Sequence, residues 1–442
     1  MKYQMFRTFF VALTLLAIST AHAFPATISS PTNEPLLYPA NLQYIGSFRL
    51  PNGPTNQTTF SYGGIGLGFD PTKNALFVTG HTWYQYTGEV SIPTPLAATN
   101  VSALPVATLI QPLTDALDGE RNLVNPTAST AEKIGGYLVY QGKLIISVES
   151  YYDGNGSQVA SHFVRPLNLS AVNSIQGPYR IGPLYPGFVS GYMTLIPPEW
   201  QPLFGGPALT GNCCLPIISE QSNGPSISVF DPAKFGTSSP VPTTELLGYP
   251  ISNPLSGYNS QFTQPINAHT SQTGDYFNGT TAINGAVFPA GTSTILFFGH
   301  QGLGAFCYGQ GTTDNSVVGT DASGPSDVWC YDAATAAKGV HAYPYTYEIW
   351  AYNANDLLQV EQGKEAPYDV KPYAVWALNP PINPNNTDSI QGAAYDPTTN
   401  RIYLSQGCAD ANCQTIIDVY QVTGASTPAI LVPAAPSNAK AQ

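Results

Sequence analysis

The sequence predicts an all-β fold, built as a single β-propeller. Five times along the chain a small or polar residue precedes a glycine that opens an alternating apolar stretch, and a second apolar strand follows after a gap. The glycines are Gly64, Gly136, Gly191, Gly285 and Gly392. A strand-built repeat of about 50 residues or more is typical of a propeller. Strand patterns recur between these glycines, whereas strongly periodic helical stretches are missing.

Each repeat unit contains three or four candidate strands. The expected units cover residues 62–112, 134–182, 187–249, 283–379 and 391–422. In the third unit we expect Leu215–Glu220 to be the second strand, and in the fourth we expect Val328–Tyr331 to be the third. A short helix is expected at Asn355–Gln362 in the fourth unit.

The fifth unit is one strand short, and the strand pattern of Leu42–Leu50 has no unit of its own. We therefore expect this N-terminal segment to become the outer strand of the last unit and to close the ring. The count is then five blades, or six if residues 326–379 form a blade of their own.

Two hairpins in the first and last units have nearly the same sequence. The segment Phe69–Val78 is repeated closely by Tyr395–Leu404, and both contain an Asp-Pro-Thr turn. This hairpin resembles the inner hairpin of many secreted β-propeller proteins of the five-bladed type. The resemblance covers most of the chain as an architecture and implies no particular function, because this fold carries many unrelated functions.

The N-terminus has the pattern of a secretory signal peptide. Lys2 and Arg7 form a basic region before a short apolar run, Phe9–Ile18, and Ala21–Ala23 is a small-x-small cleavage site. We therefore expect a signal peptide at 1–23, an N-terminal extension at 24–41, the propeller at 42–425 and a disordered tail at 426–442. This apolar run is too short for a transmembrane helix, and the sequence shows no second run of spanning length, so we expect a secreted or periplasmic protein.

The composition and net charge of the chain exclude several classes of partner. The formal net charge is −12, and it becomes −14 when Lys2 and Arg7 leave with the signal peptide. An acidic chain repels nucleic acid and anionic membranes. A hydrophobic content of 43% excludes a disordered chain. The expected partner is an extracellular glycan or a protein ligand, and the sequence leaves the oligomeric state open.

The even number of six cysteines predicts three disulfides in an exported chain. Cys408 and Cys413 are close enough to pair locally, and Cys307 and Cys330 flank one Gly- and Ser-rich loop. The adjacent Cys213 and Cys214 remain as the third pair. We expect this pair on the face opposite the candidate site, before the second strand of the third unit.

Five polar side chains end the expected second strands of the five units. They are His81, Glu149, Glu220, His300 and Gln406. Equivalent strand ends meet around one axis, so we expect a polar pocket there. Glu149 and Glu220 could act as the acid and base of glycoside cleavage. His81, His300 and Glu149 could instead hold a divalent metal ion. A third interpretation is that these side chains hydrogen-bond neighbouring blades.

Aromatic residues follow these strand ends and predict a rim that stacks on sugar rings. The candidate rim residues are Trp83, Tyr84, Tyr151, Tyr152 and Tyr308. The function predicted is recognition, and as a further step hydrolysis, of an extracellular saccharide, with Gln406 and the two histidines among the binding groups. The alternatives are a non-enzymatic adhesion or scaffold protein, and a metal-dependent hydrolase of another ester or phosphoester.

Overall fold

The computed structural model describes residues 30–53, 56–127, 132–214, 220–255, 276–304, 306–324, 327–382 and 390–425. The predicted signal peptide and C-terminal tail therefore lie outside the described residues. The described part contains six four-stranded sheets. None of its helices is long and apolar enough to cross a membrane.

Five of the sheets have four antiparallel strands ordered from an inner to an outer strand. Sheet 1 consists of β2 (Leu67–Asp70), β3 (Ala75–Thr79), β4 (Thr87–Ser91) and β5 (Leu109–Thr114). Sheet 2 consists of β6 (Lys133–Tyr140), β7 (Lys143–Glu149), β8 (His162–Pro166) and β9 (Gln176–Tyr179). Sheet 3 consists of β10 (Met193–Leu195), β11 (Ala208–Thr210), β12 (Ile227–Phe230) and β13 (Thr243–Leu247).

The remaining two sheets of this kind include segments that are distant in the sequence. Sheet 4 consists of β14 (Ala282–Val287), β15 (Thr294–Gly302), β20 (Tyr345–Asn353) and β21 (Ala374–Leu378). Sheet 5 consists of β22 (Ile390–Asp396), β23 (Arg401–Gln406), β24 (Ile416–Val422) and β1 (Leu42–Arg49).

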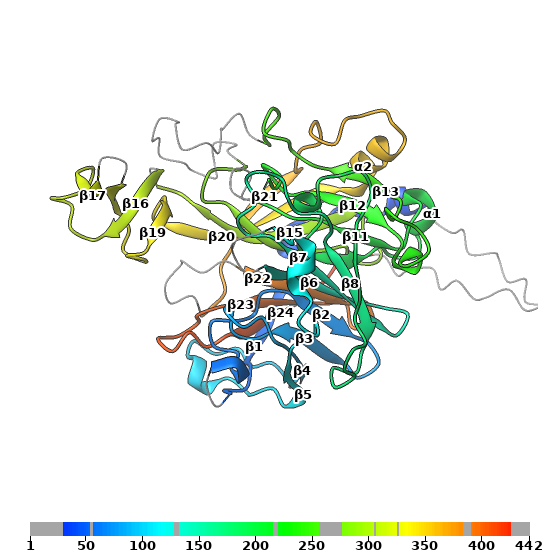
Figure 1. Cartoon of the computed structure of the whole chain (residues 1–442), viewed down its shortest axis with the longest axis horizontal. Coiled ribbons are helices and arrows are strands. Elements are labelled where there is room, and N and C mark those ends of the chain that lie inside the picture. The colour runs from blue at the N-terminus through cyan, green and yellow to red at the C-terminus, as the bar shows by residue number, and fades with distance from the viewer. Residues whose placement is uncertain are drawn as a thin grey trace, which may run out of the picture.

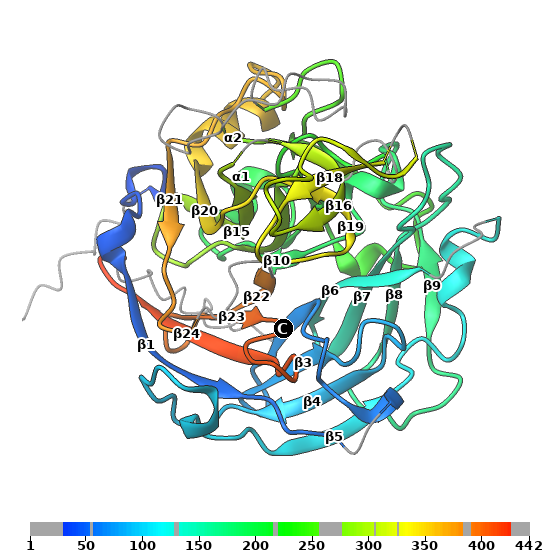
Figure 2. The ribbon, with the colours of Figure 1, turned by 90° about the vertical axis from the view of Figure 1, so that its left-hand side faces the viewer.

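The inner strands of these five sheets contact one another in a closed order. β2 contacts β6, β6 contacts β10, β10 contacts β14, β14 contacts β22, and β22 returns to β2. Figure 2 shows the sheets arranged around a common centre. This arrangement defines a β-propeller, so the predicted all-β fold class is confirmed. The count of five blades stays a prediction, which this order of contacts supports.

The N-terminal strand closes the ring as predicted. β1 pairs antiparallel with β24, from Leu42 opposite Val422 to Arg49 opposite Ile416. Within this ladder Ser47 lies opposite Asp418, and the Ser47 hydroxyl donates a hydrogen bond to its carboxylate. The two ends of the described chain are thus joined in one sheet, and β1 covers the edge that β24 would otherwise expose.

The repeated glycines have a packing reason. A Cβ on Gly136 would lie 2.8 Å from the carbonyl oxygen of Gly191, which comes just before β10 of sheet 3. A Cβ on Gly285 would lie 2.5 Å from the Cβ of Ala393 in sheet 5. Only a residue without a side chain lets neighbouring inner strands approach this closely.

The fourth unit differs from the expectation because it contains an inserted sheet. This sheet consists of β16 (Cys307–Thr312), β17 (Asp321–Gly324), β18 (Asp327–Tyr331) and β19 (Lys338–His341). It lies in the chain between β15 and β20, and Figure 1 shows it projecting from the ring. Val328–Tyr331 is therefore not the third strand of sheet 4, which is β20. The alternative in which 326–379 form their own blade is wrong, because β20 and β21 belong to sheet 4.

The third unit also differs, because its second strand is β11 and not Leu215–Glu220. Residues 215–219 lie outside the described residues, and Glu220 belongs to no strand. β11 has only three residues, too few to show a period in the sequence. A short helix, α1 (Gln201–Phe204), ends at the left-handed Gly205 and turns the chain into β11.

The other helices are short. The helix expected in the fourth unit is present as α2 (Ala354–Glu361), capped by the side chain of Asn353. The single-turn 3-10 helices are η1 (Pro31–Asn33), η2 (Pro39–Asn41), η3 (Asn56–Thr58), η4 (Val101–Ala103), η5 (Arg121–Val124), η6 (Pro186–Phe188) and η7 (Pro232–Lys234).

Candidate functional site

A polar pocket opens at the end of the central channel where the inner strands begin. It has a volume of about 260 Å³, and residues from all five sheets or the loops leading into them line it. The lining residues are Ile65, Lys133, Gly135, Glu149, Tyr151, Gly191, Tyr192, Asn212, Cys213, Cys214, Gln221, Thr281, Ala282, Asn284 and Gln391.

Three of the lining residues are β-bulges that directly precede a repeated glycine. In β6, β14 and β22 the pairing register skips one residue, which is Gly135, Asn284 and Gln391 respectively. A bulge releases a residue from the ladder and redirects its side chain, and bulges are frequent next to functional sites. Sequence reasoning missed these residues as site residues. The signal was the small or polar residue that opens each repeat.

Glu149 is the carboxylate of the pocket. It ends β7, lies opposite Lys133 in the sheet 2 ladder and is partly buried. Its Oε2 accepts hydrogen bonds from the side-chain amides of Asn212, at 3.0 Å, and Gln221, at 2.8 Å. Burial raises the pKa of Glu149, while the two amides and the charge of Lys133 oppose the rise.

Tyrosines stand beside this carboxylate. The Lys133 ammonium lies 3.9 Å from the centre of the Tyr151 ring, a cation–π contact. Tyr152 packs edge-on against Tyr151 with ring centres 4.9 Å apart, and Tyr152 is 54% exposed. Burial raises the pKa of the Tyr151 phenol, and the charges of Tyr152, Glu149 and Tyr308 add to the rise. Tyr308, from the inserted sheet, therefore lies within electrostatic reach of the pocket.

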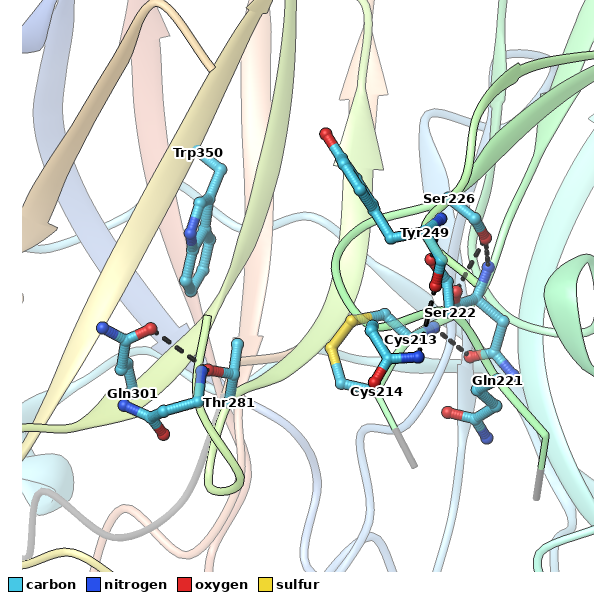
Figure 3. The surroundings of a disulfide bond; sticks show 12 residues. Cys213, Cys214, Gln221, Ser222, Ser226, Tyr249, Thr281, Gln301 and Trp350 are labelled. Atoms are coloured by element: carbon cyan, nitrogen blue, oxygen red, sulfur yellow. Dashed lines mark hydrogen bonds between the residues drawn. A yellow bond between two sulfur atoms is a disulfide. The ribbon is translucent and has the colours of Figure 1, made fainter. Parts of the chain in front are cut away.

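All three predicted disulfides are present, and one of them lines the pocket. Cys213 is bonded to Cys214, Cys307 to Cys330 and Cys408 to Cys413. The expectation that Cys213 and Cys214 lie on the opposite face is wrong. They follow β11, the true second strand of sheet 3, and line the same pocket as Glu149. Figure 3 shows the bond between them.

The predicted acid and base do not line one pocket. Glu220 is absent from the described lining residues. Its Oε2 would lie 3.3 Å from a Cβ on Gly156, next to the Tyr185 ring. Burial raises the pKa of Glu220, and the charge of Asp153 adds to the rise. Glu220 is thus directed at the 153–156 loop and the Tyr185 ring.

The two histidines lie in different surroundings. His81 packs between Tyr62 and Tyr84, with ring centres 5.4 and 5.3 Å away, and lines a separate pocket of about 640 Å³. Partial burial lowers its pKa. His300 packs edge-on against Tyr345, and burial lowers its pKa to about 4. The Nδ1 of His300 has no hydrogen-bond partner among the described residues.

The remaining predicted binding residues are also outside the polar pocket. Gln406 is buried and donates a hydrogen bond to the carbonyl oxygen of Ile382 at 2.9 Å, so it connects the end of β23 to Ile382. Trp83 is 80% exposed on the loop after β3, and Tyr84 lies beside His81. Within the described ranges, no three His, Cys, Asp or Glu side chains are grouped to hold a metal ion. His81, His300 and Glu149 are therefore not brought together.

The opposite end of the channel is apolar. A pocket of about 250 Å³ lies where the inner strands end. It is lined mainly by aliphatic, aromatic and proline side chains, among them Leu67, Tyr137, Leu195, Phe288 and Tyr395.

No protein-family model matches the sequence, and no curated protein matches it. Among solved structures, the chain is similar to one reported for the GH130 family of mannoside phosphorylases, said to contain glycoside hydrolases that target beta-1,2 mannosidic linkages in Candida mannan. The identity is 11% and the TM-score 0.42, over 88% of this chain and 96% of that one.

Two further likenesses have lower TM-scores. A glycosyl hydrolase from Bacteroides ovatus is 11% identical with a TM-score of 0.39, over 88% of this chain and 96% of that one. A GH43 endo-arabinanase from Bacillus licheniformis is 8% identical with a TM-score of 0.35, over 83% and 96%. Likenesses this weak carry no argument, so the fold class rests on the sheet topology described above.

Proposed function

We propose that this protein binds a saccharide at the polar end of its central channel. The observation that carries the proposal is the carboxylate of Glu149, held by Asn212 and Gln221 in a pocket that the five sheets and the loops joined to them line. A carboxylate fixed in this way can accept hydrogen bonds from sugar hydroxyls with little reorganisation.

The other lining groups support a sugar rather than an apolar or strongly charged ligand. Lys133 offers donors, while Asn284 and Gln391 carry amides that can donate and accept. Tyr151 presents an aromatic ring at the same pocket. One carboxylate and one ammonium nearly balance, which suits a neutral, hydroxyl-rich ligand. The volume of about 260 Å³ suits a ligand smaller than a typical drug.

Binding without cleavage is the favoured form of this function. Glycoside hydrolysis commonly needs two carboxyl groups that flank the bond to be broken. Among the described lining residues, Glu149 supplies the one carboxylate, because Glu220 is directed at Gly156 and Tyr185. The proposed site of action is outside the cytoplasm, which the three disulfides and the signal-like N-terminus support.

The test is a glycan array followed by calorimetric titration of the best glycan into the purified protein. The wild type should bind, and Glu149→Gln should weaken binding by roughly 10-fold or more, because a hydrogen bond to a charged group is lost. Release of a reducing sugar by the wild type would contradict binding without cleavage.

His81→Ala is the matched control, because His81 lines the separate pocket. It should leave the dissociation constant unchanged. A glycan that is lost on His81→Ala and retained on Glu149→Gln would contradict the proposed site, and an array without any bound glycan would contradict the function.

A further inference from the structure

The disulfide between Cys213 and Cys214 forms part of the wall of the polar pocket. Both residues are largely buried, with 6% and 7% of their surface exposed. On one side they belong to the hydrophobic cluster that includes Tyr192 and Tyr249, and on the other they line the pocket. The pair therefore forms an apolar patch of the pocket wall beside the polar side chains of Glu149, Asn212 and Gln221.

The bond joins adjacent residues, so it closes a small ring of eight atoms. That ring presents sulfur and methylene groups, which are polarisable and carry no strong hydrogen-bonding group. It has no free rotamers to lose, because the disulfide fixes both side chains. A ligand that packs on it therefore meets a surface that is already ordered.

The same residues hold this patch and the carboxylate in a fixed relation. Asn212 accepts a hydrogen bond from the Cys213 amide at 3.0 Å through Oδ1 and donates to Glu149 through Nδ2. Cys213 also pairs with Ser222 in a β-bridge, and the preceding residue, Gln221, donates to Glu149 as well. Figure 3 shows Gln221 and Ser222 beside the disulfide.

We propose that the Cys213–Cys214 disulfide is the apolar contact surface for the sugar, and that it selects pyranoses with a continuous C–H face. Such a ring has C–H groups on one face and hydroxyls at its edge. With its C–H face on the disulfide, the ring directs edge hydroxyls to Glu149. This inference rests on the saccharide-binding function proposed above and names the surface that recognises the ring.

The experiment uses the methyl α- and β-pyranosides of glucose, mannose and galactose as probes. In calorimetric titrations, the double variant Cys213→Ala/Cys214→Ala should bind the preferred pyranoside roughly 10-fold more weakly than the wild type. The matched control is Cys408→Ala/Cys413→Ala, which removes a disulfide outside the pocket and should change the dissociation constant less than about twofold.

A second readout uses the unmodified protein, so it stands even if the double variant does not fold. The protein is treated with a phosphine reductant and an alkylating agent, and labelling is followed by mass spectrometry. The saturating pyranoside should slow labelling of Cys213 and Cys214 and leave that of Cys408 and Cys413 unchanged. A protective effect spread equally over both disulfides would contradict direct contact.

The two proposals fail in different ways. If the wild type binds a pyranoside and Glu149→Gln loses it, but the disulfide variant binds equally well or no selective protection occurs, the disulfide surface is wrong and the function stands. If the wild type binds none of the pyranosides and no array glycan, both are wrong.

Discussion

The two ends of the central channel are built from the same inner strands and differ in character. Where the strands begin, bulged residues and loops supply Asn284, Gln391, Glu149 and a disulfide wall. Where the strands end, Leu195, Phe288 and their neighbours make an apolar pocket of similar volume, about 250 Å³ against about 260 Å³. Cavity size alone therefore does not mark the site. The bulges and the fixed carboxylate distinguish the end that can recognise a polar ligand.

One of the two large effects should come from a substitution in an inner strand, which runs between both ends of the channel. Gly285→Val places a branched side chain where even a Cβ would lie 2.5 Å from Ala393. We expect the free energy of unfolding to fall by about 3 kcal/mol, because two inner strands must separate. Urea denaturation measures this. The control is Gly339→Ala in the inserted sheet, where nothing lies within 4 Å of a Cβ; an equal loss there would remove the close-approach explanation.

The closing sheet offers an effect of comparable size, because it holds a buried carboxylate with a raised pKa. Burial raises the pKa of Asp418 from 3.8 to about 7, with the Ser47 hydrogen bond opposing the rise. Between these values the folded state binds the proton more tightly than the unfolded state. The free energy of unfolding should therefore fall as the pH rises through this window, on the order of 4 kcal/mol in total, and then level off.

Asp418→Asn should make this decline smaller by the share of Asp418, since the amide is neutral at every pH. Glu34 and Glu245, whose pKa values burial also raises to about 7, keep their own shares. Denaturation at about pH 4 and about pH 8 measures the difference. The exposed Asp321→Asn is the control and should keep the wild-type profile. A wild-type-like decline in Asp418→Asn would show that another group is responsible.

A smaller effect should appear in glycan affinity at the polar end of the channel and not in the stability of the fold. Because burial raises the pKa of Glu149 above 4.5, its carboxylate should protonate at a higher pH than an ordinary glutamate. Glycan affinity should fall about 10-fold as the pH drops through that pKa, when a charge-assisted hydrogen bond is lost. Titrations across pH test this, and Glu149→Gln should bind weakly with little pH dependence. A steep profile in that variant would point to a different group.

The smallest effect is expected at the apolar end. Leu195 is 41% exposed, so Leu195→Ala should cost less than about 1 kcal/mol of stability and leave glycan affinity unchanged. Titration with the array-selected glycan checks this. A loss of affinity as large as that of Glu149→Gln would mean that both ends take part in binding.

The fold was predictable because its strongest constraint is visible in the sequence. Repeated glycines such as Gly136 and Gly285 are required where neighbouring sheets approach closely, and the unpaired strand at Leu42–Leu50 had to complete a sheet. The disulfide pairs followed from spacing. By contrast, the three residues of β11 carry no detectable period, so the stronger pattern of Leu215–Glu220 was chosen. That one error moved Cys213 and Cys214 to the wrong face and placed Glu220 in the site.

The site was predictable only in part, for a related reason. Glu149 and Tyr151 follow a long, regular strand, so their place at the pocket could be inferred. The side chains at the equivalent strand ends, His81 and Gln406, instead contact Tyr62 and Ile382. These contacts depend on tertiary packing, which the sequence pattern does not show. Asn284 and Gln391 enter through bulges, and a one-residue change in register cannot be seen in an alternating pattern.

The most direct test of the account is a crystal structure of the protein soaked with the glycan selected on the array. We predict a pyranose in the polar pocket, with hydroxyls on Glu149 and a C–H face on the Cys213–Cys214 disulfide. A glycan bound at the apolar end, or in the pocket that His81 lines, would contradict it.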